Sequence, residues 1–495
     1  MGKITDKISL VSKRLFEVFF HLTFGLMLLS WVCPFKFGGR ELPIFEISYV
    51  LLAVFFVLKL ICDFNLSLPK IFSYYWSIVK KSRAILISLI LYISFGVVTL
   101  FYAQYKSFAA LKYITVIQMI GFCVFMLYYI FPKTDDGKSK NRLNCVFWNL
   151  GIVSILVSLI AMIGYITEDY TIYVRKLSTI IDYNQFSLII TMGLVSLCFL
   201  MLRSSAPILQ KYLGISAAFA IDASVILLSS SRRAYVTIIA FCAIFIVICF
   251  VNEISSLLKK RSGLKDYIYH LLALVLAVVI SFGAVFGIKS GFEHIFDKRY
   301  EAVSEVGEPT EFVSKDTEPG TFVLEQKIEE RMHSISEGNG IYRRIDIWNV
   351  VFDKLKKSSV KELIIGGGAS ASFDIYDDIT NPHVEWVYWS YDFDELTPHW
   401  MNPHNFLLCD IVEGGIVLSV LQLTLLIIMF IYAVKLIKRK PYYGIFLMIL
   451  YAVVFVNLFL SAPYGMIWNK MFWILLGIHV CENQLWLRDK KAEEK

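Results

Sequence analysis

Charged side chains are scarce in this chain of 495 residues. Asp, Glu, Lys and Arg make up only 18% of it, while 57% of the residues are hydrophobic. The mean hydropathy of +0.62 exceeds what a water-soluble fold can bury. Apolar runs of about 20 residues match the roughly 30 Å hydrocarbon core of a bilayer. The composition therefore excludes an ordinary soluble protein and predicts helical membrane spans.

Cysteine is absent from the long polar segment, where disulfides or a metal site would be expected. The nine cysteines lie almost entirely in or beside apolar runs, with no CxxC pair and none in the polar segment 291–403. We therefore expect neither a disulfide framework nor a zinc site. A GxxxxGK[ST] phosphate loop and an HExxH motif are also absent, so nothing indicates an ATP-driven pump or a metal-dependent hydrolase.

Twelve apolar segments are long enough to cross a membrane. They are residues 15–35, 43–62, 84–103, 108–131, 145–166, 185–202, 210–230, 234–252, 267–289, 405–437, 442–460 and 464–486. The first lacks a small-residue cleavage site, which predicts an anchor and not a cleaved signal peptide. The predicted fold is an all-α polytopic membrane protein with about twelve transmembrane helices.

Basic residues in the short connections predict the orientation. Lys and Arg cluster at both termini and in alternate connections, for example at 80–83 and 435–440. With twelve spans all these clusters share one side, so we expect both termini in the cytoplasm. Three regions follow: nine spans in 1–289, a large external loop at 290–404, and three spans with a cytoplasmic tail in 405–495.

The net charge of +7 conceals a division. Residues 291–403 contain 11 Lys or Arg and 22 Asp or Glu, so the remainder carries +18. That basic excess is the ordinary topology signal of a membrane protein. We expect membrane lipids as partners and no nucleic acid.

The external loop has a better specified second half. Apolar residues recur every three or four positions at Ile341, Ile345, Trp348, Phe352 and Leu355, which predicts an amphipathic helix. The run Gly366-Gly367-Gly368 then predicts a sharp turn or a close backbone approach.

Arginine occurs at three predicted external sites. These are Arg175, with Asn184 at the start of the next span, then Arg232 and Arg233, and then Arg343 and Arg344. A guanidinium presents a planar fork of donors suited to phosphate oxygens. One such residue alone is more often a surface or snorkelling side chain. Three sites on one face predict that they converge on a diphosphate, with one member of the Arg232–Arg233 pair structural.

A histidine stands where the external loop returns to the membrane. His404 has the chemistry to take a proton from a sugar hydroxyl, although an interfacial role beside a capping Asn405 is an equally simple reading. Glu413 follows within the apolar run, where an acid needs a cavity or a partner. His383 and His399 are competing bases in the same loop.

Several short segments together resemble the superfamily of O-antigen ligases and O-antigen (Wzy-like) polymerases. They are Ser231-Arg232-Arg233-Ala234, Arg175 with Asn184, Arg344 with Trp348 and Gly366-Gly367-Gly368, and His404-Asn405 with Gly415-Ile416. The order of spans and the late external loop also fit. The resemblance covers about residues 170–420.

The resemblance implies a GT-C-like glycosyltransferase in the bacterial cytoplasmic (inner) membrane. Its donor is a glycan on undecaprenyl diphosphate at the outer face, and its acceptor is a glycan or lipid-glycan hydroxyl. It implies inversion at the anomeric carbon, without cofactor or obligatory metal, and leaves room for a chain-length regulator as partner. Carried over by position, the catalytic candidates are His404, Arg232 and Arg344, and the substrate-binding candidates are Arg175, Asn184, Arg233, Arg343, Asn405 and Glu413.

One departure from the family pattern bears on the acceptor. Ligases often end the His-Asn segment in Gly-x-x-Thr-Thr, whereas Gly415 is followed here by Ile416-Val417-Leu418-Ser419. We therefore expect a polymerase of lipid-linked repeat units, with ligation of a finished glycan as the close alternative. A flippase for lipid-linked sugars is the remoter one, because few charges lie within the spans and no repeated halves are visible.

Overall fold

The computed structural model is predominantly helical. It describes residues 2–32, 36–37, 40–41, 44–103, 105–133, 137–167, 177–179, 183–229, 231–258, 264–304, 339–376, 403–461 and 465–493. The chain divides into two compact units. The first unit contains residues 1–20, 52–143 and 338–495, and the second contains 21–51 and 144–337. Each is described by itself.

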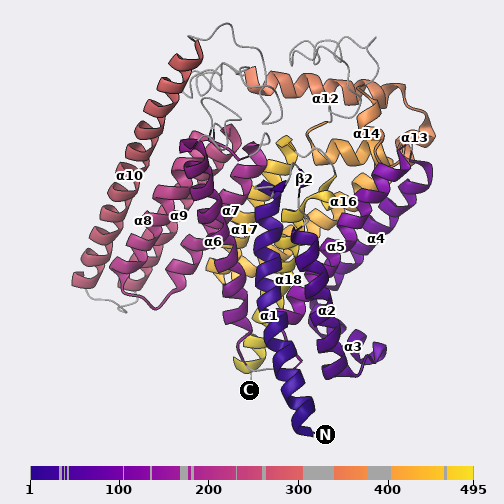
Figure 1. The fold of residues 1–495 in the computed structure, drawn as a ribbon, viewed down its shortest axis with the longest axis horizontal. Coiled ribbons are helices and arrows are strands. Elements are labelled where there is room, and N and C mark those ends of the chain that lie inside the picture. Colours follow the sequence, from indigo (N-terminus) through magenta and orange to yellow (C-terminus); the bar gives the residue numbers. More distant parts are fainter. Residues whose placement is uncertain are drawn as a thin grey trace. The chain divides into compact units, whose positions relative to one another are not determined.

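The helices of the first half of the chain follow the predicted apolar runs closely (Figure 1). They are α1 (Gly2–Val32), α2 (Ile44–Phe64), α3 (Leu68–Val79), η1 (Lys80–Ser82), α4 (Arg83–Thr99), η2 (Leu100–Tyr102), α5 (Lys106–Ile130), α6 (Ser139–Ile166), α7 (Tyr183–Arg203) and α8 (Ile208–Leu228). A two-residue hairpin, β1 (Lys36–Phe37) with β2 (Arg40–Glu41), joins α1 to α2.

The second half contains longer helices and the elements of the polar segment. They are α9 (Arg232–Leu258), α10 (Leu264–Ser304), α12 (Asn339–Lys357), α13 (Val360–Ile365), α14 (Ala371–Asp374), α16 (Phe406–Arg439), α17 (Pro441–Ser461), η3 (Met466–Trp468) and α18 (Lys470–Glu493). The prediction of an all-α polytopic membrane protein is confirmed.

Eleven helical segments of the described chain are long and apolar enough to cross a membrane. They correspond to the first eleven predicted spans. The twelfth, expected at 464–486, falls on η3 and α18, which is outside this set. Polar residues such as Glu482 and Asn483 lower the hydropathy of α18, while its first turns, for example Phe472 and Trp473, are buried among protein. A helix shielded by protein needs less apolar surface, so the count of twelve stays a prediction.

Helix α10 extends past the residue at which the external loop is predicted to begin. The loop was expected from residue 290, but α10 continues without a break to Ser304. The reason is a further apolar face beyond the expected end of the span. Phe292 and Phe296, one turn apart, pack on Tyr165 of α6, with ring centroids 6.3 and 5.0 Å from the tyrosine ring.

Within the second unit, α8, α9 and α10 lie side by side (Figure 1). A buried carboxyl ties α8 to α6: Asp222 accepts hydrogen bonds from the hydroxyls of Ser154 and Ser158, both at 2.8 Å. Such hydrogen bonds offset the cost of an acid inside a membrane protein. Asp222 is therefore a structural link between two predicted spans.

Within the first unit, the amphipathic helix predicted in the polar segment is confirmed as α12, which lies crosswise to α4 and α5 (Figure 1). The residues that define the apolar pattern are not all on the side of α12 that packs. Ile345 and Phe352 are exposed, at 39% and 44%, whereas Ile347, Val350 and Val351 are buried. Apolar residues occupy both sides of α12, so the spacing alone could not select the side that packs.

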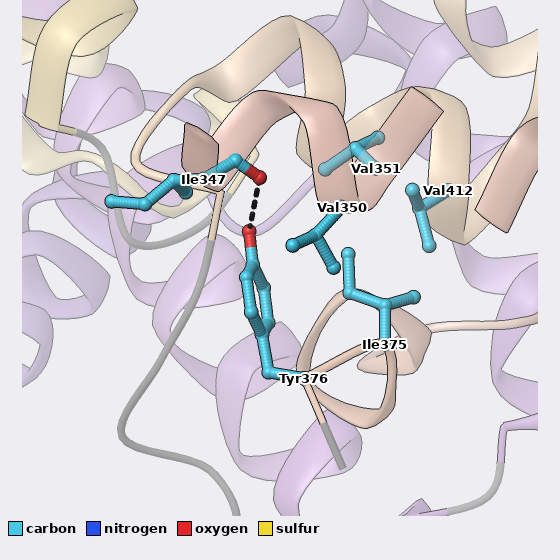
Figure 2. Packing of buried hydrophobic residues seen from close by; sticks show 6 residues of the cluster. All are labelled: Ile347, Val350, Val351, Ile375, Tyr376 and Val412. Carbon is cyan, nitrogen blue, oxygen red and sulfur yellow. Dashed lines mark hydrogen bonds between the residues drawn. The ribbon is translucent and has the colours of Figure 1, made fainter. Parts of the chain in front are cut away.

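The packed side of α12 belongs to a small apolar core (Figure 2). Ile347, Val350 and Val351 meet Ile375 and Tyr376, which follow α14, and Val412 of α16. The hydroxyl of Tyr376 donates to the carbonyl of Ile347 at 3.1 Å. This cluster fastens the polar segment to the first turns of α16.

Candidate functional site

The predicted arginine site at Arg232 and Arg233 lies between α8 and α9 in the second unit, and we call the segment Ser231–Arg233 the basic junction. Helix α8 ends at Leu228, and α9 begins with Arg232 and Arg233. Ser231, only 2% exposed, donates its hydroxyl to the side-chain carbonyl of Asn184 at 3.0 Å. Two of the segments singled out by the resemblance, 47 residues apart in the chain, are thus in direct contact.

Further hydrogen bonds fix the backbone at this junction. The hydroxyls of Ser187 and Ser229 are 2.9 Å apart, which links α7 to the end of α8. The amide of Leu177 donates to the carbonyl of Leu228 at 3.0 Å. The junction is therefore built from three stretches of chain. Arg175 and the side chain of Arg232 lie outside the described residues, so their predicted roles remain predictions.

An apolar groove of about 390 Å³ runs between α8, α9 and α10 in the second unit. Tyr212 and Leu274 line it toward one end, and Ser231, Tyr235 and Lys289 toward the other. On α8 its lining extends from Tyr212 to Leu227, which is about 22 Å at 1.5 Å per residue. The groove thus has the length of most of a membrane span.

The ends of this groove differ in polarity. Nearly all lining residues are apolar, but Ser231 directly precedes the two arginines of the junction. Lys289 adds a cation there and forms an ion pair with Glu293 at 3.1 Å. An apolar groove with a lysine at one end, next to the start of α9, suits an amphiphile with an apolar chain and an anionic head. Sequence reasoning missed Lys289 because a lone lysine in an apolar run carries no motif.

In the first unit, His404 immediately precedes α16. Its backbone is left-handed, with φ of 48°, so it lies outside the helix and does not share a helical face with Glu413 as expected. Asn405 is the N-cap, and its side chain accepts from the amides of Leu407 (2.9 Å) and Leu408 (3.3 Å). The capping interpretation of Asn405 is confirmed.

Helix α12 contacts the residue before His404. The indole of Trp348 donates to the carbonyl of Pro403 at 3.1 Å, and its ring meets that of Phe459 edge-on at 5.5 Å. Arg344 is four residues before Trp348, on the same side of α12. The segments of Arg344 and His404, predicted to act together, are thus connected within one unit.

Arg344 has an incompletely satisfied guanidinium. Its Nη1 atom is buried, and within the described chain it has no hydrogen-bond partner. Buried donors are nearly always paired in proteins, and an unpaired one costs about 1–3 kcal/mol. An anionic oxygen would satisfy it. The side chain of Arg343 lies outside the described part, so its role stays a prediction.

The three glycines of the polar segment meet a break in α16. Gly415 has φ of 63° and ψ of −161°, which interrupts the helix. The carbonyls of Val412 and Glu413 accept instead from the amides of Gly367 (2.8 Å) and Gly368 (3.0 Å). A Cβ on Gly366 would lie 2.4 Å from the carbonyl of Glu413. The predicted close backbone approach is confirmed, and we call Gly366–Gly368 with Gly415 the glycine clasp.

The clasp is also tied to α4 and η2. The amide of Ala369 donates to the carbonyl of Thr99 at 3.2 Å, and the hydroxyl of Tyr102 donates to the carbonyl of Ile365 at 2.6 Å. The Glu413 carboxylate, buried at 3% exposure, accepts from the hydroxyl of Ser372 at 2.8 Å. Its observed partner is the segment after the clasp, and its predicted contact with substrate remains untested.

Charged groups that sequence reasoning missed lie near Glu413. Asp410 is buried and accepts from the hydroxyl of Tyr92 and from the amide nitrogen of Gln422, the latter at 2.5 Å. Lys112 of α5 interacts electrostatically with Glu413 and lies 5.6 Å from the ring centre of Trp468. The partners come from distant stretches of chain, so no local pattern identified them.

The predicted site residues are thus distributed over both units. Asn184, Arg232 and Arg233 belong to the second unit, and Arg343, Arg344, His404, Asn405 and Glu413 belong to the first. Each group is assembled within its own unit as described. His383 and His399, the competing bases, lie outside the described residues.

Comparison with known families identifies the part of the chain that contains both groups. Residues 217–423 match the family model described as O-antigen ligase. This segment is similar to the O-antigen ligase family. The match begins within α8 and ends within α16, so it includes the basic junction, α9, α10, Arg344, the glycine clasp and His404. A comparison with curated proteins finds no match.

The family match confirms the resemblance seen in the sequence motifs. It supports a membrane glycan-processing enzyme with glycosyltransferase-like activity. Asn184 and Arg175 lie outside the matched segment, although Asn184 bonds directly to Ser231 within it. The O-antigen ligase family segment therefore depends on an earlier helix, α7, to complete its basic junction.

Proposed function

We propose that this protein transfers a glycan from a lipid diphosphate to a hydroxyl acceptor at the outer face of the bacterial cytoplasmic membrane. The donor is an undecaprenyl-diphosphate-linked oligosaccharide, and the preferred acceptor is another lipid-linked glycan, so that repeat units are polymerised. The large polar segment lies outside and both termini lie in the cytoplasm.

One observation carries this proposal: the apolar groove of the second unit ends at the basic junction. A polyprenyl tail fits a lining that is apolar for about 22 Å. The diphosphate at its head then meets Ser231, Lys289 and the arginines that open α9. A soluble nucleotide sugar has no use for such a groove.

The chemistry assigned to the residues is a direct displacement. The acceptor oxygen attacks the anomeric carbon, the bond from that carbon to the diphosphate oxygen breaks, and the configuration inverts. His404 accepts the hydroxyl proton, and Arg232 and Arg344 stabilise the negative charge that develops on the departing diphosphate. Donors aimed at such charge typically contribute about 10²–10³-fold each. Arg175, Asn184, Arg233, Arg343, Asn405 and Glu413 bind or position the substrates.

The groove is tested by filling it. Ile239 lines it and is 51% exposed, so Ile239→Trp places a large ring in the groove without disturbing the buried core. We expect purified Ile239→Trp protein to show a KM for a long-chain polyprenyl donor raised about tenfold or more. For a donor with a short alkyl chain, we expect the KM of Ile239→Trp to equal that of the unchanged protein.

A matched control is available on the same helix. Val236 is 58% exposed and does not line the groove. Val236→Trp should leave both donors unaffected. Equal kinetics of Ile239→Trp and Val236→Trp with the long-chain donor would remove the observation on which the proposal depends.

The acceptor distinguishes the polymerase from the alternative O-antigen ligase. A ladder of chain lengths on the carrier lipid, formed by purified protein from one synthetic repeat unit, identifies a polymerase. Finished polymer that remains on the carrier when the gene is deleted identifies a ligase.

A further inference from the structure

A polar cavity lies at the end of α16 that is opposite to His404. It has a volume of about 170 Å³ and is lined by residues of η1, α16 and α18, all in the first unit. Two lysines face it from separate elements, Lys81 from η1 and Lys435 from the last turns of α16. Asn483 and Trp486 of α18 also line the cavity.

Hydrogen bonds between the three elements fix the shape of this cavity. The hydroxyl of Tyr432, which also lines it, donates to the carbonyl of Lys81 at 3.1 Å. The side-chain amide of Asn483 donates to the hydroxyl of Ser82 at 2.9 Å. The three elements that frame the cavity are therefore held to one another by hydrogen bonds.

Among the described residues, the charge of the lining has one sign. Those that line the cavity include two lysines and no Asp or Glu. The Lys435 ammonium lies 5.5 Å from the ring centre of Tyr432. An anion between the two lysines is attracted by both positive charges. Basic pockets between membrane helices on the cytoplasmic side commonly bind phosphate-bearing head groups.

The volume of the cavity and its apolar lining residues indicate which class of ligand it can hold. A water occupies about 30 Å³ in the liquid, so a cavity of about 170 Å³ holds a phosphate with an ester substituent. Leu436 and Leu487 line the cavity beside the lysines, which suits the first carbons that follow a phosphodiester.

We propose that Lys81, Lys435, Asn483 and Trp486 form a phosphate-binding site at the cytoplasmic end of the first unit, distinct from the glycan-transfer residues. Its ligand is a phosphate monoester or diester, supplied either by an anionic lipid head group or by a soluble phosphate. Occupancy joins η1, α16 and α18 through one anion. The site does not depend on the proposed transferase reaction.

The test measures binding to the full-length protein in zwitterionic detergent micelles by native mass spectrometry. The lipid probes are phosphatidylglycerol and phosphatidylcholine, and the soluble probe is inorganic phosphate. We expect Lys81→Gln/Lys435→Gln to weaken phosphatidylglycerol binding about thirtyfold, because each lysine near an anionic lipid surface contributes about 1 kcal/mol and 1.36 kcal/mol is tenfold.

The control removes the same charge from the same elements. Lys80 and Lys438 are exposed on η1 and α16 but do not line the cavity. Lys80→Gln/Lys438→Gln should bind phosphatidylglycerol as the unchanged protein does. Lys81→Arg/Lys435→Arg should retain binding, which separates loss of the site from loss of the fold.

The two sources give different results. Lysine-dependent binding of phosphatidylglycerol that millimolar inorganic phosphate does not displace identifies a lipid head group. Lysine-dependent binding of inorganic phosphate, to which phosphatidylglycerol adds nothing, identifies a soluble phosphate. If the two glutamine double variants bind both probes equally, the site does not exist.

Discussion

At the scale of single residues, the environment of Arg344 is the most informative. A buried guanidinium nitrogen without an acceptor in the described chain is a cost that evolution rarely leaves in place without use. The neighbouring indole of Trp348 holds the carbonyl of Pro403, so the arginine is carried on a helix fixed beside His404. An anion that binds to the Arg344 guanidinium therefore meets a donor that is already held in place.

The corresponding prediction concerns three separate substitutions. Arg232→Ala, Arg344→Ala and His404→Ala should each abolish polymer formation, with activity lower by at least about 10²-fold, while the protein accumulates normally in the membrane. Polymer length on gels and immunoblots of membranes measure the two quantities. Lys354→Ala, which removes an exposed cation from α12, should be without effect. Normal polymer in all three variants would end the mechanism.

Sequence reasoning at this scale succeeded where a residue belongs to a short motif. Ser231 and Asn184 were both identified from such segments, and they are hydrogen-bonded. It failed for Asp410, whose partner Tyr92 is 318 positions away in the chain. A single acid inside an apolar run gives no indication of its partner. Only the packing of α4 against α16 supplies that information.

At the scale of elements, the broken helix α16 stands out. The sequence showed Gly414-Gly415 inside an apolar run, which was predicted as one continuous span, 405–437. The break at Gly415 follows from a three-dimensional contact: the backbone of residues 364–366 comes so close that a Cβ on Gly415 would lie 2.5 Å from the carbonyl of Ile364. A helix period cannot reveal an insertion from elsewhere in the chain.

Substitutions in the glycine clasp should therefore be costly. Gly366→Ala and Gly415→Ala each introduce a Cβ at positive φ and against backbone atoms that cannot move independently. We expect a loss of about 1–3 kcal/mol of stability each, by analogy with overpacked sites, and strongly reduced activity. Thermal unfolding in detergent measures the first quantity.

The control for the clasp lies on α10. A Cβ on Gly291 would meet nothing within 4 Å, and replacing a helical glycine by alanine stabilises by roughly 0.5–1 kcal/mol. Gly291→Ala should thus leave the unfolding temperature unchanged or raised. Clasp variants that unfold at the same temperature as Gly291→Ala would show that the close approach is dispensable.

At the scale of the whole molecule, the number of crossings decides where the two ends lie. Eleven helical segments of the described chain meet the length and hydropathy needed for a span, and α18 does not. The basic clusters predict an even number, with α18 as the twelfth. Eleven of the predicted spans are helices of the expected length and hydropathy, because lipid contact selects composition. Hydropathy is the weakest signal for a helix enclosed by protein.

Thiol labelling settles this count. In a variant without native cysteines, Lys354→Cys on α12 should react with a membrane-impermeant maleimide in intact cells. Lys490→Cys, near the end of the chain, should react only after permeabilisation. Labelling of Lys490→Cys in intact cells would place the tail outside and leave eleven crossings, which would also reverse the assignment of the phosphate-binding site to the cytoplasm.

The glycine clasp has a consequence for engineering acceptor specificity. Exchange of the polar segment between related proteins is an obvious way to change the acceptor, and residues 339–376 look like a transplantable module in the sequence. Their amides, however, complete the hydrogen bonding of an interrupted membrane helix, and α4 supplies a further anchor. A chimera that imports the segment without the matching turn of α16 leaves the carbonyls of Val412 and Glu413 unpaired, so exchange boundaries belong beyond Gly415.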